Sequence, residues 1–285
     1  MKALVTGAHG AFGSYFAEWL AQRPEWEVVR TARTGHTGAD FIPCDLNDPA
    51  AIRAVIFEIR PTHVFHLAAS FSGNLDVDIA INATSARHLI ESVREAGLTS
   101  RVVLFGSAAE YGLVTRSENP IKEDRVLCPV SSYGISKALQ THLAGFYAHE
   151  FGSDVVVARI FNLILPGLAE RMFPGRMERQ IARFKRGETD KIQVGNLENW
   201  RDYIGGQQSA EMILDISTHG RRGEIYHVAS GKAIQMRQVL EEMLIKNDLT
   251  WSVVQEKIEG GPRSGYDVPI IYADISKTQS LSEEP

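Results

Sequence analysis

The chain has 285 residues, of which 44% are hydrophobic and 23% charged, as in an ordinary folded protein of one large domain or two closely joined ones. Its 30 lysines and arginines stand against 35 aspartates and glutamates, and no basic run or stripe indicates a nucleic-acid partner. No apolar run approaches the roughly 18–20 residues that span a bilayer, so no membrane partner is expected.

The two cysteines, Cys44 and Cys128, form neither a disulfide framework nor a metal-ligand spacing. This usage fits a reducing cytoplasm, and no bound metal is expected. Met1 leads straight into an apolar run, which leaves no room for a signal peptide. The sequence therefore predicts a cytoplasmic protein.

The chain opens with Lys2–Thr6, an apolar run typical of a buried parallel strand. Gly7, Gly10 and Gly13 follow at three-residue intervals, and residues 14–22 are helical in pattern. A strand, a glycine turn and a helix N-terminus together form a cradle for a pyrophosphate. The G-x-x-G-x-x-G spacing differs from the commonest dinucleotide fingerprint, and it also fits a purely structural turn.

A second strand is expected at 27–31, where an acidic residue would bind the adenosine ribose of NAD. The chain offers Arg30 and Arg33 instead, with no carboxylate before Asp40. An arginine here can pair with a 2′-phosphate, which favours NADP. The same arginines could equally be solvated loop residues.

Strands and helices then alternate through the first half of the chain, which predicts an α/β fold with a doubly wound parallel sheet. The expected strands are 41–43, 63–67, 101–105 and 155–159, and the expected helices are 50–59, 82–95 and 131–151. Ligands of such sheets bind at the carboxyl ends of the strands. The residues expected at these ends are Gly7, Asp45, Ala68, Ser107 and Asn162.

The helix that opens at Ser131 or Ser132 carries Tyr133 and Lys137 four residues apart, on the same face. The lysine charge is expected to lower the tyrosine pKa and make the phenol a proton donor or acceptor for a carbonyl. Ser107, two residues beyond a strand, could hydrogen-bond the same carbonyl. Taken alone, the tyrosine–lysine spacing also fits a buried tyrosine beside a solvated lysine.

With these three features in order, the chain resembles the extended short-chain dehydrogenase/reductases, the NAD-dependent epimerase/dehydratase family, along nearly its whole length. The matching segments include TGAHGAFG (6–13), CDL (44–46), HLAA (66–69), GSAAEYG (106–112), SSYGISK (131–137), RIFNLILPG (159–167) and GNLENWRDYI (195–204). Family members use NAD or NADP and mostly act on nucleotide-activated sugars. GSAAEYG, GNLENWRDYI, GEIYHVASGKAI (223–234) and the stretch 263–269 resemble the branch of GDP-4-keto-6-deoxy-mannose reductases, which forms GDP-rhamnose.

The resemblance implies a role for individual residues. The implied catalytic residues are Ser107, Tyr133 and Lys137, of which the last two also contact the cofactor. The implied cofactor contacts are Gly7, Gly10 and Gly13 at the pyrophosphate, Asp45 and Leu46 at the adenine, and Ala68 in the groove. The implied substrate contacts are Ser107, Asn162 facing the sugar nucleotide, and Arg201 and Arg263 at its diphosphate. Without the family, both arginines could be surface residues.

The expected organisation is a Rossmann-type domain at 1–165, to which 203–230 returns, and a smaller C-terminal substrate-binding lobe from 166–202 and 231–285. Helices 82–95 and 131–151 resemble the dimer-forming helices of the family, so a homodimer is expected. The leading interpretation is an NADP(H)-dependent reductase of a nucleotide-activated 4-keto-6-deoxy sugar, with NAD as a possible cofactor. A nucleotide-sugar 4-epimerase with tightly bound NAD, or a non-catalytic dinucleotide-binding protein, stays open.

Two segments depart from the family's patterns. Residues 168–176, LAERMFPGR, are unlike the family and lie where the sugar nucleotide is expected. The 4,6-dehydratases carry carboxyl groups one or two residues after the catalytic Ser or Thr, where this chain has Ala108 and Ala109. In an extended loop Glu110 would point away from Ala109. We therefore expect no dehydratase activity.

Overall fold

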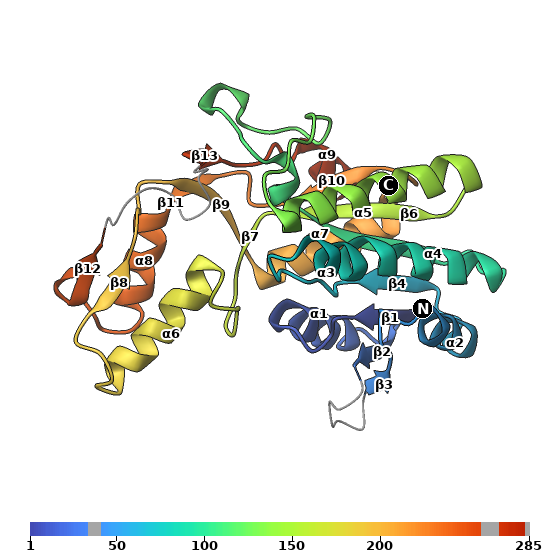
Figure 1. Ribbon diagram of the computed structural model, residues 1–285, viewed down its shortest axis with the longest axis horizontal. Coiled ribbons are helices and arrows are strands. Elements are labelled where there is room, and N and C mark those ends of the chain that lie inside the picture. The colour runs from blue at the N-terminus through green and yellow to red at the C-terminus, as the bar shows by residue number, and fades with distance from the viewer. Residues whose placement is uncertain (34–40, 258–267, 283–285) are drawn as a thin grey trace.

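The computed structural model describes residues 1–33, 41–257 and 268–282, and a seven-stranded sheet forms its centre (Figure 1). The strand order is β10-β6-β5-β4-β1-β2-β3, and every neighbouring pair is parallel. The strands are β1 (Lys2–Thr6), β2 (Glu27–Ala32), β3 (Phe41–Pro43), β4 (His63–His66), β5 (Arg101–Ser107), β6 (Val155–Ile160) and β10 (Ile225–Val228). The parallel sheet predicted from the sequence is confirmed.

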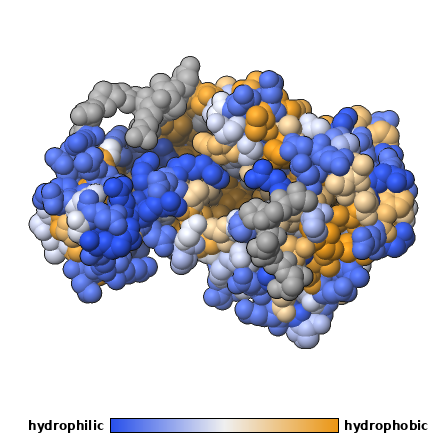
Figure 2. Space-filling model, turned by 60° about the horizontal axis from the view of Figure 1, so that its bottom comes forward, coloured by the Kyte–Doolittle hydropathy of each residue, from blue (hydrophilic) through white to orange (hydrophobic). Residues whose placement is uncertain are grey.

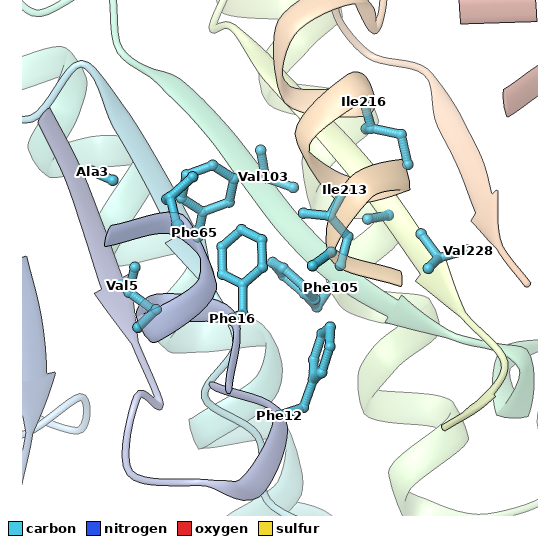
Figure 3. Close-up of a cluster of buried hydrophobic side chains, with 14 of the residues drawn as sticks. Ala3, Val5, Phe12, Phe16, Phe65, Val103, Phe105, Ile213, Ile216 and Val228 are labelled. Carbon is cyan, nitrogen blue, oxygen red and sulfur yellow. The ribbon is translucent and has the colours of Figure 1, made fainter. Parts of the chain in front are cut away.

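Helices cover both faces of this sheet because its strands bury apolar side chains on both. In β5, Val103 and Phe105 belong to one buried cluster and Val102 and Leu104 to the other, as the two-residue repeat of a strand requires. Phe16 lies at the centre of the first cluster, with its ring centroid 6.3 Å from that of Phe105 (Figure 3). The first face is covered by α1 (Ala11–Ala21) and α7 (Gly206–His219), and the second by α2 (Pro49–Ile59), α4 (Ser85–Glu95) and α5 (Ser132–Phe151).

The order of the strands reverses between β1 and β4, which is where a ligand is expected. From β1 the chain moves to β2 and β3 on one side, and β4, β5, β6 and β10 then follow on the other. Ligands of open α/β sheets bind at the carboxyl ends of the strands where this direction reverses. The glycine turn after β1 and Ala68 after β4 both lie at this point.

The helix expected at 82–95 is longer and less regular than predicted. It opens as α3 (Leu75–Ile79), where Asn74 accepts a hydrogen bond from the Val77 N–H at 3.2 Å, and passes through a π-helical turn at Ala80–Thr84 into α4. Asn82 within this turn bonds Ser70 at 2.7 Å and Ser136 at 2.8 Å. Such long-range polar contacts leave no trace in hydrophobic periodicity. The sequence pattern therefore does not indicate the helical turns between residues 75 and 81.

A smaller lobe lies at the left of Figure 1 and has an apolar core of its own, which includes Met177, Ile181, Val194 and Leu240. It contains α6 (Phe173–Lys185), α8 (Met236–Ile245) and the paired strands β8 (Ile192–Val194) and β12 (Val254–Glu256). A second sheet of β11 (Ala233–Gln235), β9 (Trp200–Gly205), β13 (Ile270–Ile271) and β7 (Asn162–Ile164) runs from this lobe toward the large sheet.

The end of the described chain differs from the expected division, which assigned all of 231–285 to the smaller lobe. In α9 (Ser276–Gln279), Thr278 donates to the His227 carbonyl at 2.7 Å and Lys277 to the Ile225 carbonyl at 2.8 Å. Leu281 is buried in the same cluster as α1 and α7. Residues 276–282 therefore pack on β10 and the large sheet. Within the described ranges, no helix is long and apolar enough to cross a membrane.

Candidate active site

The glycine turn is built so tightly that two of its three positions have no room for a side chain. Gly7 adopts a φ of 68°, and a Cβ there would lie 2.5 Å from the Ala68 nitrogen. A Cβ on Gly13 would lie 2.2 Å from the Gly7 carbonyl oxygen. Gly10 is less constrained, because its Cβ would approach the same oxygen only to 3.4 Å. The turn thus brings β1, the end of β4 and the start of α1 together.

This cradle fits the pyrophosphate of a dinucleotide. Backbone N–H groups can approach a ligand only where no side chain stands between, as at these glycines. The first turn of α1 also carries no acidic residue, and no side chain caps it at Gly10. The positive end of the helix dipole is therefore not neutralised by the protein's own carboxylates.

The other predicted cofactor residues lie at the carboxyl ends of neighbouring strands. Arg30 is half-buried within β2, and Arg33 is exposed directly after it. Asp45, two residues after β3, accepts hydrogen bonds from Asn47 at 3.0 and 3.1 Å, and Leu46 packs on the core beneath α2 and α4. The structure therefore gathers these residues along the edge that also holds the glycine turn.

Ser107 and Tyr133 meet where β5 and α5 approach each other. Ser107 is the last residue of β5, and Tyr133 lies in the first turn of α5, which Ser131 caps by accepting the Gly134 N–H at 3.1 Å. Burial raises the pKa of the Tyr133 phenol, and the nearby Ser107 hydroxyl acts against this rise. The phenol therefore holds its proton at neutral pH, as a proton donor to a ketone must.

Lys137 is buried, and its ammonium donates to the Phe105 carbonyl at 2.8 Å and to Gln140 at 2.9 Å. Burial lowers its pKa to about 8. The expectation that Lys137 lowers the pKa of Tyr133 is wrong here. The two residues share a helical face, but the lysine side chain runs to β5, and the Tyr133 pKa is raised, not lowered.

Sequence reasoning missed a buried carboxylate that organises the start of α5. Asp78 of α3 accepts hydrogen bonds at 2.8 to 2.9 Å from the hydroxyls of Ser70, Ser72 and Ser132, and from the Ser72 N–H at 2.8 Å. Burial opposes its ionisation, but these hydrogen bonds outweigh burial and lower its pKa to about 2. Asp78 thereby fixes the residue next to Tyr133.

An aromatic ring and an arginine also approach Tyr133. The Phe71 ring, half-exposed, lies 4.8 Å from the Tyr133 ring, and the Arg171 guanidinium lies 5.4 Å from the Phe71 centroid. The charge of Arg171 acts to lower the Tyr133 pKa, against the effect of burial. Arg171 belongs to the 168–176 segment. In the sequence, the departure of this segment from the family pattern indicates an unusual substrate region, but not the contact of Arg171 with Phe71.

The predicted substrate residues lie around the second sheet. The Asn162 amide donates to the Asp202 carbonyl at 3.0 Å, and the Arg201 guanidinium donates to the carbonyls of Trp200 and Val268 at 2.8 and 2.6 Å. Asn162 and Arg201 therefore sit on paired strands, β7 and β9. Arg263 lies outside the described residues.

The molecule is hollowed between the smaller lobe and the larger unit, and hydrophobic residues line the inside of the hollow (Figure 2). A glycine cradle at the reversal point of the sheet, next to a strand-end serine and a Tyr-x-x-x-Lys helix, defines the class of short-chain dehydrogenase/reductase enzymes. The sequence matches the NAD dependent epimerase/dehydratase family over residues 3–229, and the chain belongs to that family.

Individual relatives carry related activities. GDP-6-deoxy-D-mannose reductase of Pseudomonas aeruginosa is 27% identical over 265 residues, which are 90% of this chain and 83% of the relative. GDP-mannose 4,6-dehydratase of Vibrio cholerae is 26% identical over 266 residues, 84% of this chain and 70% of the relative. The solved structure of RMD from Pseudomonas aeruginosa complexed with NADPH shares the fold, with a TM-score of 0.85 at 23% identity over 99% of this chain and 92% of that one.

Proposed function

We propose that the protein is an NADP(H)-dependent reductase of a nucleotide-activated 4-keto-6-deoxy sugar. The observation that carries the proposal is the meeting of Ser107 and a protonated Tyr133 beside the glycine cradle, in a loop with alanines at the next two positions. This set supplies one proton to a ketone oxygen, and the two positions after Ser107 add no carboxyl group to it. The similarity to GDP-6-deoxy-D-mannose reductase supports the same substrate class, and with it GDP-rhamnose formation.

The residues divide the work of a ketone reduction. Tyr133 gives its proton to the sugar oxygen, and Ser107 orients the carbonyl by a hydrogen bond. Lys137 supplies a positive charge and binds the nicotinamide ribose. The bound nicotinamide supplies the hydride. The residues proposed to hold the cofactor are Gly7, Gly10, Gly13, Arg33, Asp45, Leu46 and Ala68.

The substrate is proposed to lie in the hollow between the lobe and the larger unit (Figure 2). Asn162 faces the sugar nucleotide, and Arg201 and Arg263 bind the diphosphate. Pairing of β7 with β9 places Asn162 opposite Tyr203, two residues from Arg201. The two polar side chains can therefore serve one ligand.

We infer further that the enzyme is a cytoplasmic homodimer. The surface of α5 exposes apolar residues that a partner copy would cover: Ile135, Leu139, Phe146 and Phe151, each between 38% and 52% exposed. Exposed apolar patches of this kind mark interaction surfaces. The partner helix would be α5 or α4 of the second copy.

NADPH is expected to bind more tightly than NADH. Arg33 is exposed after β2, where a carboxylate would favour NAD, and a charge-assisted hydrogen bond to a phosphate contributes about 1.5–3 kcal/mol, a tenfold to hundredfold preference. Arg33→Ala should weaken NADPH and leave NADH unchanged in fluorescence titrations. Arg53→Ala, which removes a surface arginine paired with Glu95 at 2.8 Å, is the matched control. Equal dissociation constants for the two cofactors would contradict the assignment.

The protein is expected not to dehydrate nucleotide sugars. Ala108 and Ala109 cannot exchange protons, and Glu110 is fully buried against Arg159 at 2.8 Å. The loop is a 3-10 helix, Ala108–Tyr111, and not extended as expected, so the ion pair and not strand alternation directs Glu110 away from a substrate. Incubation with GDP-mannose and NADP, followed by NMR, should show no 4-keto-6-deoxy product. Its accumulation would reassign the enzyme as a dehydratase.

A further inference from the structure

Glu110 lies directly beneath the catalytic serine, and its carboxylate joins three segments. One oxygen accepts the Ser107 N–H at 2.6 Å. The other accepts the Thr141 hydroxyl at 2.8 Å and the Arg159 Nη2 at 2.8 Å. Glu110 and Arg159 are both 0% exposed. The end of β5, helix α5 and strand β6 therefore meet at one carboxylate.

The groups around Glu110 hold its carboxylate in a single position. Arg159 also donates to the Tyr111 hydroxyl at 2.7 Å, and that hydroxyl meets the His227 Nε2 at 2.5 Å. Since His227 Nδ1 faces the Asp274 carbonyl at 2.8 Å, Nδ1 carries the ring proton and Nε2 accepts from Tyr111. Each of these side chains thus has a hydrogen-bond partner, and buried networks satisfied in this way specify one arrangement.

The tie to α5 falls on the catalytic face of that helix. Tyr133, Lys137 and Thr141 follow one another at intervals of four residues, so they share a face. Lys137 binds the Phe105 carbonyl of β5 at 2.8 Å, and Thr141 binds Glu110 just beyond the end of β5. These two hydrogen bonds set how close that face of α5 lies to Ser107.

We propose that Glu110 is a positioning residue of the active site, which fixes Ser107 relative to Tyr133 and Lys137 through its bonds to the Ser107 N–H, Thr141 and Arg159. The inference rests on the proposed reductase function for its catalytic readout. A buried ion pair is in itself weak support for stability, because apolar replacements are often equally stable. Its place under the catalytic loop is what gives this pair a further role.

Glu110 also acts on Lys137 through its charge. Burial lowers the pKa of Lys137 to about 8, and the Glu110 carboxylate acts against this fall. The ring of His66, on β4, faces Lys137. Burial lowers the pKa of His66 to about 3, so the imidazole is neutral at working pH. On α5 itself, the hydrogen-bond partner Gln140 is uncharged. Among the described residues, Glu110 is the group whose charge offsets the desolvation of Lys137.

The test is Glu110→Gln, read by a titration that needs no substrate. In protein labelled with ¹³C at the lysine ε carbons, the Lys137 signal is assigned by its loss in Lys137→Arg. We expect the Lys137 midpoint to fall by about one pKa unit or more in Glu110→Gln, as loss of a nearby opposite charge requires. Turnover should fall by up to about 10²-fold through misplacement of Ser107.

Glu118→Gln is the matched control. Glu118 accepts the Thr115 N–H at 2.6 Å and pairs with Arg125 at 2.8 Å, in a capping arrangement like that of Glu110, but it touches neither β5 nor α5. It should leave both the lysine titration and turnover unchanged. Glu110→Gln combined with Arg159→Met removes both buried charges, so it should fold with a melting temperature near that of the wild type.

In the double variant, the positioning role predicts a low Lys137 midpoint and slow turnover despite restored stability. Recovery of stability, midpoint and turnover together would show a purely structural role and overturn the inference. A wild-type protein that reduces no keto sugar, yet whose Lys137 midpoint falls in the double variant, would refute the proposed function and leave the inference on Glu110 standing.

Discussion

Tyr133→Phe is expected to lower turnover by about 10²–10⁴-fold, the usual contribution of a positioned general acid. In the proposed mechanism the phenol is the proton donor, and burial keeps it protonated at neutral pH because burial raises its pKa. Phenylalanine keeps the ring that contacts Phe71 at 4.8 Å, so the shape of the site should persist. Stopped-flow or steady-state oxidation of NADPH with a 4-keto-6-deoxy nucleotide sugar measures the loss.

The same helix provides the control for this variant. Tyr147 also lies on α5, but its hydroxyl donates to Glu91, far along the helix from Ser107. Tyr147→Phe removes one phenol hydroxyl from the same element and should leave turnover close to that of the wild type. NADPH binding should persist in both variants. Near-normal turnover in Tyr133→Phe would remove the phenol from the mechanism.

Gly13→Ala is expected to disrupt the cofactor cradle. Its Cβ would lie 2.2 Å from the Gly7 carbonyl oxygen and 2.8 Å from the Gly7 carbonyl carbon, and backbone atoms cannot move aside as a flexible side chain can. Overpacking typically costs about 1–3 kcal/mol in the free energy of unfolding, and a rigid contact this short belongs at the upper end or beyond. Thermal unfolding and NADPH titration should both show the damage.

Gly10→Ala separates this steric effect from a general sensitivity of the turn. Its Cβ would approach the Gly7 oxygen only to 3.4 Å, and its φ of −73° suits any residue. Its melting temperature should stay close to that of the wild type. If Gly10→Ala and Gly13→Ala lowered the melting temperature equally, the close approach of Gly13 to Gly7 would not be what requires glycine there.

The sequence predicted what local patterns encode. Apolar runs gave the strands of the large sheet, and the four-residue spacing of Tyr133 and Lys137 placed both on one face of α5. Because the carboxyl ends of parallel strands share an edge, Gly7, Ala68 and Ser107 were expected along one crevice, and they lie at the ends of β1, β4 and β5.

Contacts between distant segments could not be predicted in this way. Asp78 binds Ser132 across 54 positions and Glu110 binds Arg159 across 49, and neither contact changes the periodicity of its segment. The Lys137 side chain likewise follows its hydrogen bond to Phe105, a residue of another element. These contacts depend on the packing of α5 against β5, which the sequence specifies only through the whole fold.

The measurement that tests the proposed function most directly is reduction of nucleotide-activated 4-keto-6-deoxy sugars with NADPH deuterated at the transferable position. The purified protein is incubated with a panel that varies the base and the sugar, and the products are assigned by NMR. We predict oxidation of the cofactor in step with the appearance of a 6-deoxy sugar that carries deuterium at C4. A protein that oxidises no cofactor with any keto sugar, and instead interconverts unmodified nucleotide sugars at C4 using tightly bound NAD, would contradict the account and identify an epimerase.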